Sequence, residues 1–170
     1  MINEFTFPDA EQMFPKVVAV AEQIAGLKRR IKAEGLPAIY VNDNFGKWQS
    51  DLPQLAEKCR SADCKGRAIV ERLAPQKDDY VILKPRHSGF FGTPLELLLT
   101  TFDARRLIIT GIATDSCVLY TAADAYMRDY ELIVPSDCVA AINSQAHNNA
   151  LTHIETMLKA NISHSSDLNL

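Results

Sequence analysis

The sequence predicts an α/β fold in which helices cover both faces of a mainly parallel sheet. Short runs of apolar and β-branched residues alternate along the chain with segments of helical hydrophobic spacing. Strands that read as continuous apolar runs are typical of a parallel sheet buried on both sides. The length of 170 residues fits one domain, and no internal repeat or low-complexity tract divides residues 1–170.

Strands are predicted where short apolar runs end at turn-forming residues. Pro85 and Gly89 stop one such run, and Gly111 follows another. The predicted strands cover residues 38–41, 81–83, 107–110 and 132–134, with a last short strand over 161–163.

Helices are predicted where apolar residues recur every three or four positions. The first predicted helix ends before Gly35, a residue type that suits the position just after a helix. Pro94 suits the first turn of another, because its missing N–H costs nothing there. The predicted helices cover residues 17–31, 52–58, 68–73, 93–100, 117–129 and 144–160.

Composition argues against several classes of function. The net charge of −3 argues against a nucleic-acid partner, which usually requires a basic face. No apolar run reaches membrane-spanning length, so no membrane partner is expected, and the first residues lack the pattern of a signal peptide. The four cysteines have no zinc-binding spacing. Because secretory features are missing, reduced thiols in a cytoplasmic protein are expected. A Gly-x-Gly-x-x-Gly motif is absent, so no cofactor is expected.

The most informative segment of the chain is Leu107–Val118, where a β-branched strand ends in a glycine turn and Cys117 follows. Thr114 or Asp115 is expected to cap a helix here, with the thiol at its N-terminus. The helix dipole at that end favours a thiolate, and free backbone N–H groups suit an oxyanion. The alternative is that Cys117 is a small buried hydrophobic residue.

Lys84 directly follows the predicted strand over 81–83. Ligands of open α/β sheets bind beyond the carboxyl ends of the strands, and Lys84 and Cys117 both stand at such ends. A lysine beside a thiol would favour the thiolate and hold the site anionic. The alternative is a solvated lysine at the end of a strand.

Three segments together resemble the isochorismatase-like cysteine hydrolases, which include nicotinamidases, N-carbamoylsarcosine amidohydrolases, ureidoacrylate hydrolases and isochorismatases. The segments are Tyr40–Gly46, Leu83–Leu95 and Gly111–Val118, in the family's order along nearly the whole chain. The resemblance implies a Rossmann-like three-layer α/β/α fold with strand order 3-2-1-4-5-6. It also implies a catalytic Cys117 and Lys84, a cis peptide bond between Ile112 and Ala113, and an oxyanion hole formed by the N–H groups of Ala113 and Cys117.

The family also uses an aspartate at the end of its first, central strand, and this chain lacks both. The opening residues Met1–Phe5 are similar to those that directly follow the aspartate in the family. The domain is therefore interpreted as N-terminally truncated. Either a start was assigned at an internal methionine and the strand lies upstream, which we favour, or the protein itself lacks the strand.

Asp43 and Asn44 follow the predicted strand over 38–41 and are candidates for substrate binding. Asp43 is interpreted as a pocket carboxylate or as a turn-forming residue between two asparagines. Nicotinamidases of the family carry an Asp-x-His motif here, and this chain has Asn42-Asp43-Asn44. The imidazole ligands of a zinc site are missing, so no metal is expected.

Four further residues are candidates for the substrate pocket. Arg86 is interpreted as a partner for a substrate carboxylate or as a surface ion-pairing residue, and His87 lies in the Lys84 loop. Phe90 and Trp48, together with Phe91, are expected to form part of a pocket lid or of a subunit interface.

The predicted function is hydrolysis of a C–N bond in a small amide or ureide through a thioester on Cys117. True isochorismatases generally lack this cysteine, so Cys117 favours the amidohydrolase branch. The alternative is a catalytically impaired pseudoenzyme or ligand-binding protein, because the family aspartate is absent. The resemblance also implies a homo-oligomer.

Overall fold

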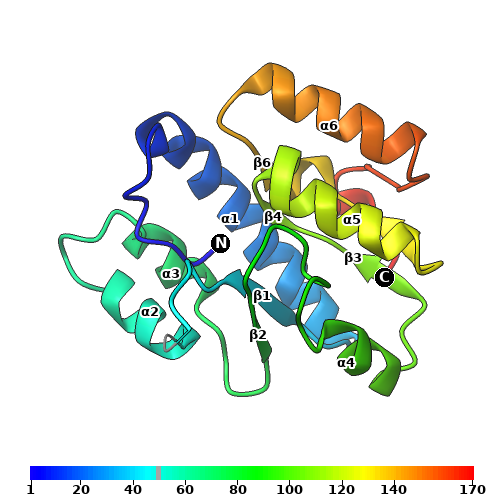
Figure 1. The fold of residues 1–170 in the computed structure, drawn as a ribbon, viewed down its shortest axis with the longest axis horizontal. Helices are drawn as coiled ribbons and strands as arrows, with labels where there is room; N and C mark the ends of the chain where they lie inside the picture. Colours follow the sequence, from blue (N-terminus) through cyan, green and yellow to red (C-terminus); the bar gives the residue numbers. More distant parts are fainter. Residues whose placement is uncertain (49–50) are drawn as a thin grey trace.

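The computed structural model describes residues 1–48 and 51–170 (Figure 1). Six helices carry most of the secondary structure: α1 (Ala10–Ala33), α2 (Leu52–Cys59), α3 (Arg67–Leu73), α4 (Leu95–Thr101), α5 (Leu119–Tyr126) and α6 (Ser144–Thr156). The strands are β1 (Ile39–Asp43), β2 (Tyr80–Lys84), β3 (Arg106–Ile108), β4 (Gly111–Ile112), β5 (Glu131–Ile133) and β6 (Val139–Ala140). Three short helical turns complete the structure: η1 (Thr114–Val118), η2 (Ser136–Cys138) and η3 (Ser165–Asp167).

The strands form three parallel two-stranded ladders. β1 pairs with β2, β3 with β5, and β4 with β6. β3 and β4 follow one another along the chain, and they pair in the same order with β5 and β6. Asn161 adds one parallel bridge to Ile133, in place of the last strand predicted over 161–163.

Within the described residues, no ladder joins β1 to β3 or β4. The family order expects its first strand at this junction. Met1 and Ile2 reach the carboxyl end of the junction, where the side-chain amide of Asn42 pairs with both the N–H and the C=O of Ile2. On the other side, a Cβ added to Gly111 would lie 3.3 Å from the side chain of Met1.

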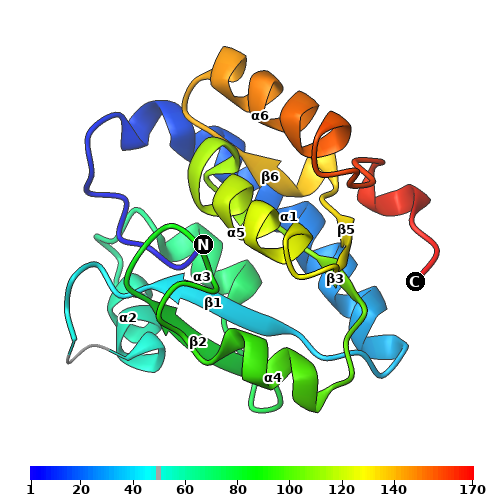
Figure 2. The ribbon, with the colours of Figure 1, turned by 45° about the vertical axis from the view of Figure 1, so that its right-hand side comes forward.

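Helices cover both faces of the strands, which gives the three layers of a Rossmann-like α/β fold (Figure 2). One core lies under α4, α5 and α6, and the other lies under α1, α2 and α3. Neighbouring strand residues alternate between them, since Ile82 belongs to the first core and Leu83 packs against the second. This alternation follows from the two-residue period of a strand.

Two helix starts differ from the predictions by three residues or more. α1 begins at Ala10 rather than at Val17, because Ala10 and Met13 extend its buried stripe and the helix continues through Pro15. Helical backbone around Cys117 begins at Thr114, as a single π-helical turn that leads into α5. The prediction that Thr114 or Asp115 caps this helix is therefore wrong: Ala113 occupies the cap position, and no side chain bonds there.

One pairing escaped the sequence patterns. The strand predicted over 107–110 overlaps β3 alone, and β4 lies just beyond it and pairs with β6. β6 is only two residues long and directly follows η2, so it carries no periodicity that a sequence pattern could reveal.

Candidate active site

Three elements bring polar side chains together at the carboxyl edge of the strands. Asp43 ends β1 and Lys84 ends β2, and the two are register partners in the parallel ladder. Cys117 lies in η1, which follows β4. Because parallel strands end on the same edge, residues far apart in the sequence meet at one place.

Lys84 is buried, and its ammonium group contacts three acceptors. Nζ lies 3.2 Å from Asp43 Oδ2, 3.0 Å from the carbonyl oxygen of Arg86 and 3.3 Å from Cys117 Sγ. An ammonium has three N–H donors, so these contacts use its full capacity. The lysine side chain is 6% exposed and that of Asp43 34% exposed, so this ion pair is largely shielded from solvent. The arrangement places a fixed positive charge against the thiol.

The turn that carries Cys117 is held by its backbone and by α6. The Ile112–Ala113 peptide bond is cis, at the position that the family resemblance implies. The carbonyl oxygen of Ala113 accepts hydrogen bonds from the N–H groups of Ser116 and Val118, each at 3.1 Å. Thr114 is fully buried, and its hydroxyl lies 2.9 Å from Nδ1 of His147 on α6.

His87 is the second side chain beside the thiol. Its Nδ1 lies 3.8 Å from Cys117 Sγ, and its ring stacks on Tyr120 with a centroid separation of 5.7 Å. The loop that carries His87 is attached to α5. Ser88 Oγ donates to Asp124, and the N–H of Gly89 donates to Thr121 Oγ1 at 2.9 Å.

Asp43 and Asn44 both shape the turn after β1. Asp43 Oδ1 accepts a hydrogen bond from the N–H of Phe45 at 2.6 Å, so this residue forms a turn as well as the ion pair. Asn44 is buried, and its side chain accepts from the N–H of Gly46. No three His, Cys, Asp or Glu side chains of the described residues gather as a metal site requires. Asp43, flanked by asparagines and engaged by Lys84, does not fit a metal-ligand set.

Three candidates remain: Phe90, Trp48 and Arg86. Phe90 is buried against Tyr130 and under the guanidinium of Arg128. Trp48 is 81% exposed. The guanidinium of Arg86 donates a hydrogen bond to the neighbouring carbonyl of Pro85, whereas the carbonyl oxygen of Arg86 accepts one from Lys84 Nζ.

Sequence reasoning missed His147, which falls in the helix predicted over 144–160 and received no role there. A signal was present, because His147 lies three, four and seven positions before the buried Ala150, Leu151 and Ile154. A histidine on the buried stripe of a helix requires a hydrogen-bond partner, and Thr114 is that partner.

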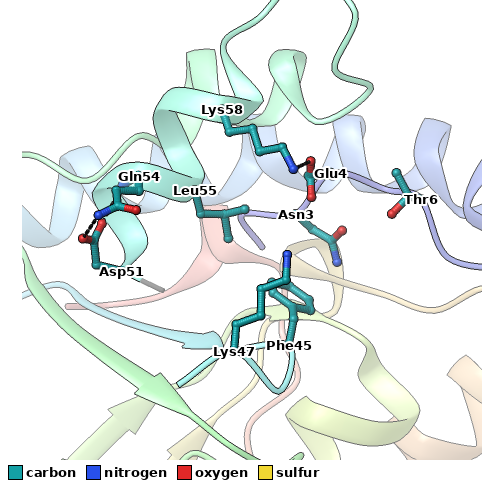
Figure 3. Close-up of a pocket in the computed structure, with 9 residues that line it drawn as sticks. All are labelled: Asn3, Glu4, Thr6, Phe45, Lys47, Asp51, Gln54, Leu55 and Lys58. Atoms are coloured by element: carbon teal, nitrogen blue, oxygen red, sulfur yellow. Dashed lines mark hydrogen bonds and ion pairs between the residues drawn. The ribbon is translucent and has the colours of Figure 1, made fainter. Parts of the chain in front are cut away.

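A cavity of about 390 Å³ lies beside the turn that follows β1 (Figure 3). Phe45 and Lys47 line it from this turn, and Asn3 and Glu4 line it from the N-terminal segment. Lys58 of α2 closes another side and forms an ion pair with Glu4. Lys84, His87 and Cys117 are not among its lining residues, so it adjoins the Asp43 turn without containing the thiol.

Within residues 1–48 and 51–170, no helix combines the length and the apolar character needed to cross a membrane.

Comparison with known proteins places the chain in a family. The Isochorismatase domain model matches residues 1–166. The isochorismatase family protein YaaI of Bacillus subtilis (strain 168) is 40% identical over 162 residues, which are 95% of this chain and 88% of YaaI. The ureidoacrylate amidohydrolase RutB of Klebsiella pneumoniae (strain 342) is 38% identical over 118 residues, which are 69% of this chain but only 50% of that longer protein.

A solved structure gives the same result. The N-carbamoylsarcosine amidase of Thermoplasma acidophilum superimposes with a TM-score of 0.73 at 28% identity, over 92% of this chain and 88% of the amidase. Family model, sequence relative and solved structure each cover most of the chain. This protein therefore belongs to the isochorismatase family of hydrolases.

Proposed function

We propose that this protein hydrolyses a C–N bond of a small amide or ureide, with Cys117 as the nucleophile and Lys84 as the fixed charge that favours its thiolate. The observation that carries the proposal is the 3.3 Å contact between Lys84 Nζ and Cys117 Sγ at the carboxyl edge of the strands. A cation beside a cysteine favours the thiolate, which is the reactive form. The position of the thiol in the turn after β4 leaves it accessible, because Cys117 is only half-buried.

In the proposed reaction the Cys117 thiolate attacks the carbonyl carbon and forms a tetrahedral oxyanion. The N–H groups of Ala113 and Cys117 are proposed to bind that oxygen. The C–N bond then breaks, the amine or ammonia leaves, and water hydrolyses the resulting thioester to a carboxylate or a carbamate. The names of two relatives, an N-carbamoylsarcosine amidase and a ureidoacrylate amidohydrolase, support small amides and ureides as the substrate class.

The test is ammonia release from a panel of small primary amides, N-carbamoyl amino acids and ureides, measured with the wild type and with Cys117→Ala. We expect release from at least one class and its loss in the variant. Cys138→Ala is the matched control, because Cys138 is a buried free thiol in η2. Hydrolysis that persists in Cys117→Ala would overturn the mechanism. A wild type that hydrolyses no member of the panel would favour the alternative, a ligand-binding protein without catalysis.

The predicted homo-oligomer remains a prediction, and light scattering tests it. Two aromatic side chains available to a subunit contact, Trp48 and Phe91, are 81% and 61% exposed.

A further inference from the structure

We propose that His87 is the catalytic acid–base residue of this site: it takes the proton of the Cys117 thiol and gives it to the leaving amine. The proposal rests on the proposed function and assigns the proton transfers that it requires.

The contacts of Cys117 single out His87. Among the described residues, the side chains within hydrogen-bonding range of Sγ are those of Lys84 and His87. An ammonium has no lone pair and cannot take a proton, whereas a neutral imidazole nitrogen can. The third nearby group, the carboxylate of Asp43, bonds to Lys84 Nζ and to the N–H of Phe45 instead. Among the described side chains, the imidazole of His87 is therefore the one that can accept a proton directly from the thiol.

The distance from Nδ1 to Sγ is long but suits this role. At 3.8 Å it exceeds a strong hydrogen bond, and catalytic contacts commonly shorten only when substrate is bound. The side chain of His87 is exposed, so no packed core opposes a small approach of the ring toward the sulfur. The same exposure leaves the ring accessible to a leaving group.

The surroundings hold the ring in place. The backbone on the C-terminal side of His87 is fixed by the bonds of Ser88 and Gly89 to α5. The ring itself stacks on Tyr120, one turn along from Cys117 on the same helical segment. One helical segment therefore positions both the nucleophile and its proposed base.

The charged and titratable groups around His87 come from several elements. Cys117 faces it from η1, Tyr120 from α5 and Lys84 from the end of β2, and Arg86 precedes it in the loop. Lys84 forms an ion pair with Asp43, and farther along α5 the carboxylate of Asp124 is engaged by Ser88 and Arg128.

The proton balance closes over the two half-reactions. His87 accepts the thiol proton as the S–C bond forms, and donates it to the nitrogen as the C–N bond breaks. In the second half, the imidazole takes a proton from the attacking water and returns it to sulfur as the S–C bond breaks. The sum is one water consumed, with one amine and one acid released.

The first test follows alkylation of Cys117 by iodoacetamide, read by mass spectrometry of its peptide, between about pH 6 and pH 9.5. An ordinary thiol titrates near about pH 8.5, so at pH 6.5 only about 1% is thiolate. In His87→Asn we expect the alkylation rate at pH 6.5 to be roughly tenfold below that of the wild type. At about pH 9.5 the two rates should approach one another. Asn places an amide near the position of Nδ1 but cannot take a proton.

The control variants distinguish the loss of proton transfer from a change in the structure around the thiol. His153→Asn alters an exposed histidine of α6 and should leave the alkylation rate and kcat/KM unchanged. His87→Gly should regain alkylation when imidazole is added, because free imidazole supplies the missing base. Tyr120→Ala should slow alkylation and Tyr120→Phe should not, because only the ring is needed for stacking. A thermal melt confirms that each variant is folded.

The second test measures kcat/KM as a function of pH, with a substrate identified in the panel of small amides and ureides. Loss of a general acid–base typically costs about 10²- to 10⁴-fold, and we expect a loss of that size in His87→Asn. Alkylation and kcat/KM that both match the wild type in His87→Asn would overturn the proposal while leaving Cys117 as the nucleophile. Conversely, His87-dependent alkylation without any hydrolysis supports the proton transfer to His87 and counts against the proposed function alone.

Discussion

Lys84 Nζ lies 3.3 Å from Cys117 Sγ, although the two residues are 33 positions apart in the sequence. The lysine side chain is only 6% exposed, so its charge acts on the sulfur with little screening by water. A strand end and the turn after another strand meet here because β2 and β4 run parallel and finish on the same edge.

Replacing Lys84 by Met keeps the length and apolar stem of the side chain and removes its charge. We expect kcat/KM to fall by about 10²- to 10³-fold, the effect typical of removing one preorganised electrostatic partner. Alkylation of Cys117 near neutral pH should slow as well, because the thiolate loses its cation. The control is Lys77→Met, an exposed lysine before β2. Equal losses in the two variants would count against a role for Lys84.

Replacing Asp43 by Asn leaves the turn intact, because the amide oxygen can still accept from the N–H of Phe45. The buried ammonium of Lys84 then loses its counter-ion. Since Asp43 is about one-third exposed, we expect a destabilisation of about 1–2 kcal/mol, below the cost of breaking a fully buried pair. Urea unfolding measures it. Asp103→Asn, at an exposed ion pair with Arg105, should change stability by less than about 0.5 kcal/mol.

The hydrogen bond between the Thr114 hydroxyl and Nδ1 of His147 connects the turn that carries Cys117 to α6. Thr114→Val has nearly the same shape but leaves the histidine nitrogen unpaired, so we expect a loss of about 1–3 kcal/mol in unfolding free energy. Thr114→Ser keeps the hydroxyl and should retain more of the hydrolase activity than the valine variant. If the valine variant were the more active of the two, the hydroxyl would not be what positions the turn.

Stability should depend on pH through His147. Burial, together with the nearby charge of Lys16, lowers the pKa of His147 below its ordinary value of 6.5. The unfolded chain therefore binds the proton more readily, and the stability that neutral His147 contributes is lost as the pH falls below about 6.5. His147→Asn retains a partner for Thr114 but does not titrate, so its unfolding free energy should decline less between about pH 7 and pH 5. His153→Asn serves as the control, and equal slopes for His147→Asn and the wild type would refute this link.

The sequence by itself determined the alternation of strands and helices, and it placed Lys84 and Cys117 at strand ends. Both are local properties: an apolar run of a few residues, and the proline or glycine that stops it. The family resemblance likewise rested on short contiguous segments. For the same reason the strand predicted over 81–83 is the centre of β2, and the helix predicted over 52–58 differs from α2 by one residue.

Only the tertiary structure decided what those residues contact. The Asp43–Lys84 ion pair depends on strand register. The placement of Thr114 against His147 depends on how α6 packs. The stacking of His87 on Tyr120 depends on the attachment of a loop to α5. The burial of Phe90, expected in the pocket, follows from the core beneath α4 and α5. Each of these contacts joins residues more than 30 positions apart or buries a side chain among distant segments. Local hydrophobic patterns carry no information about such pairings, because they arise from the simultaneous packing of several elements.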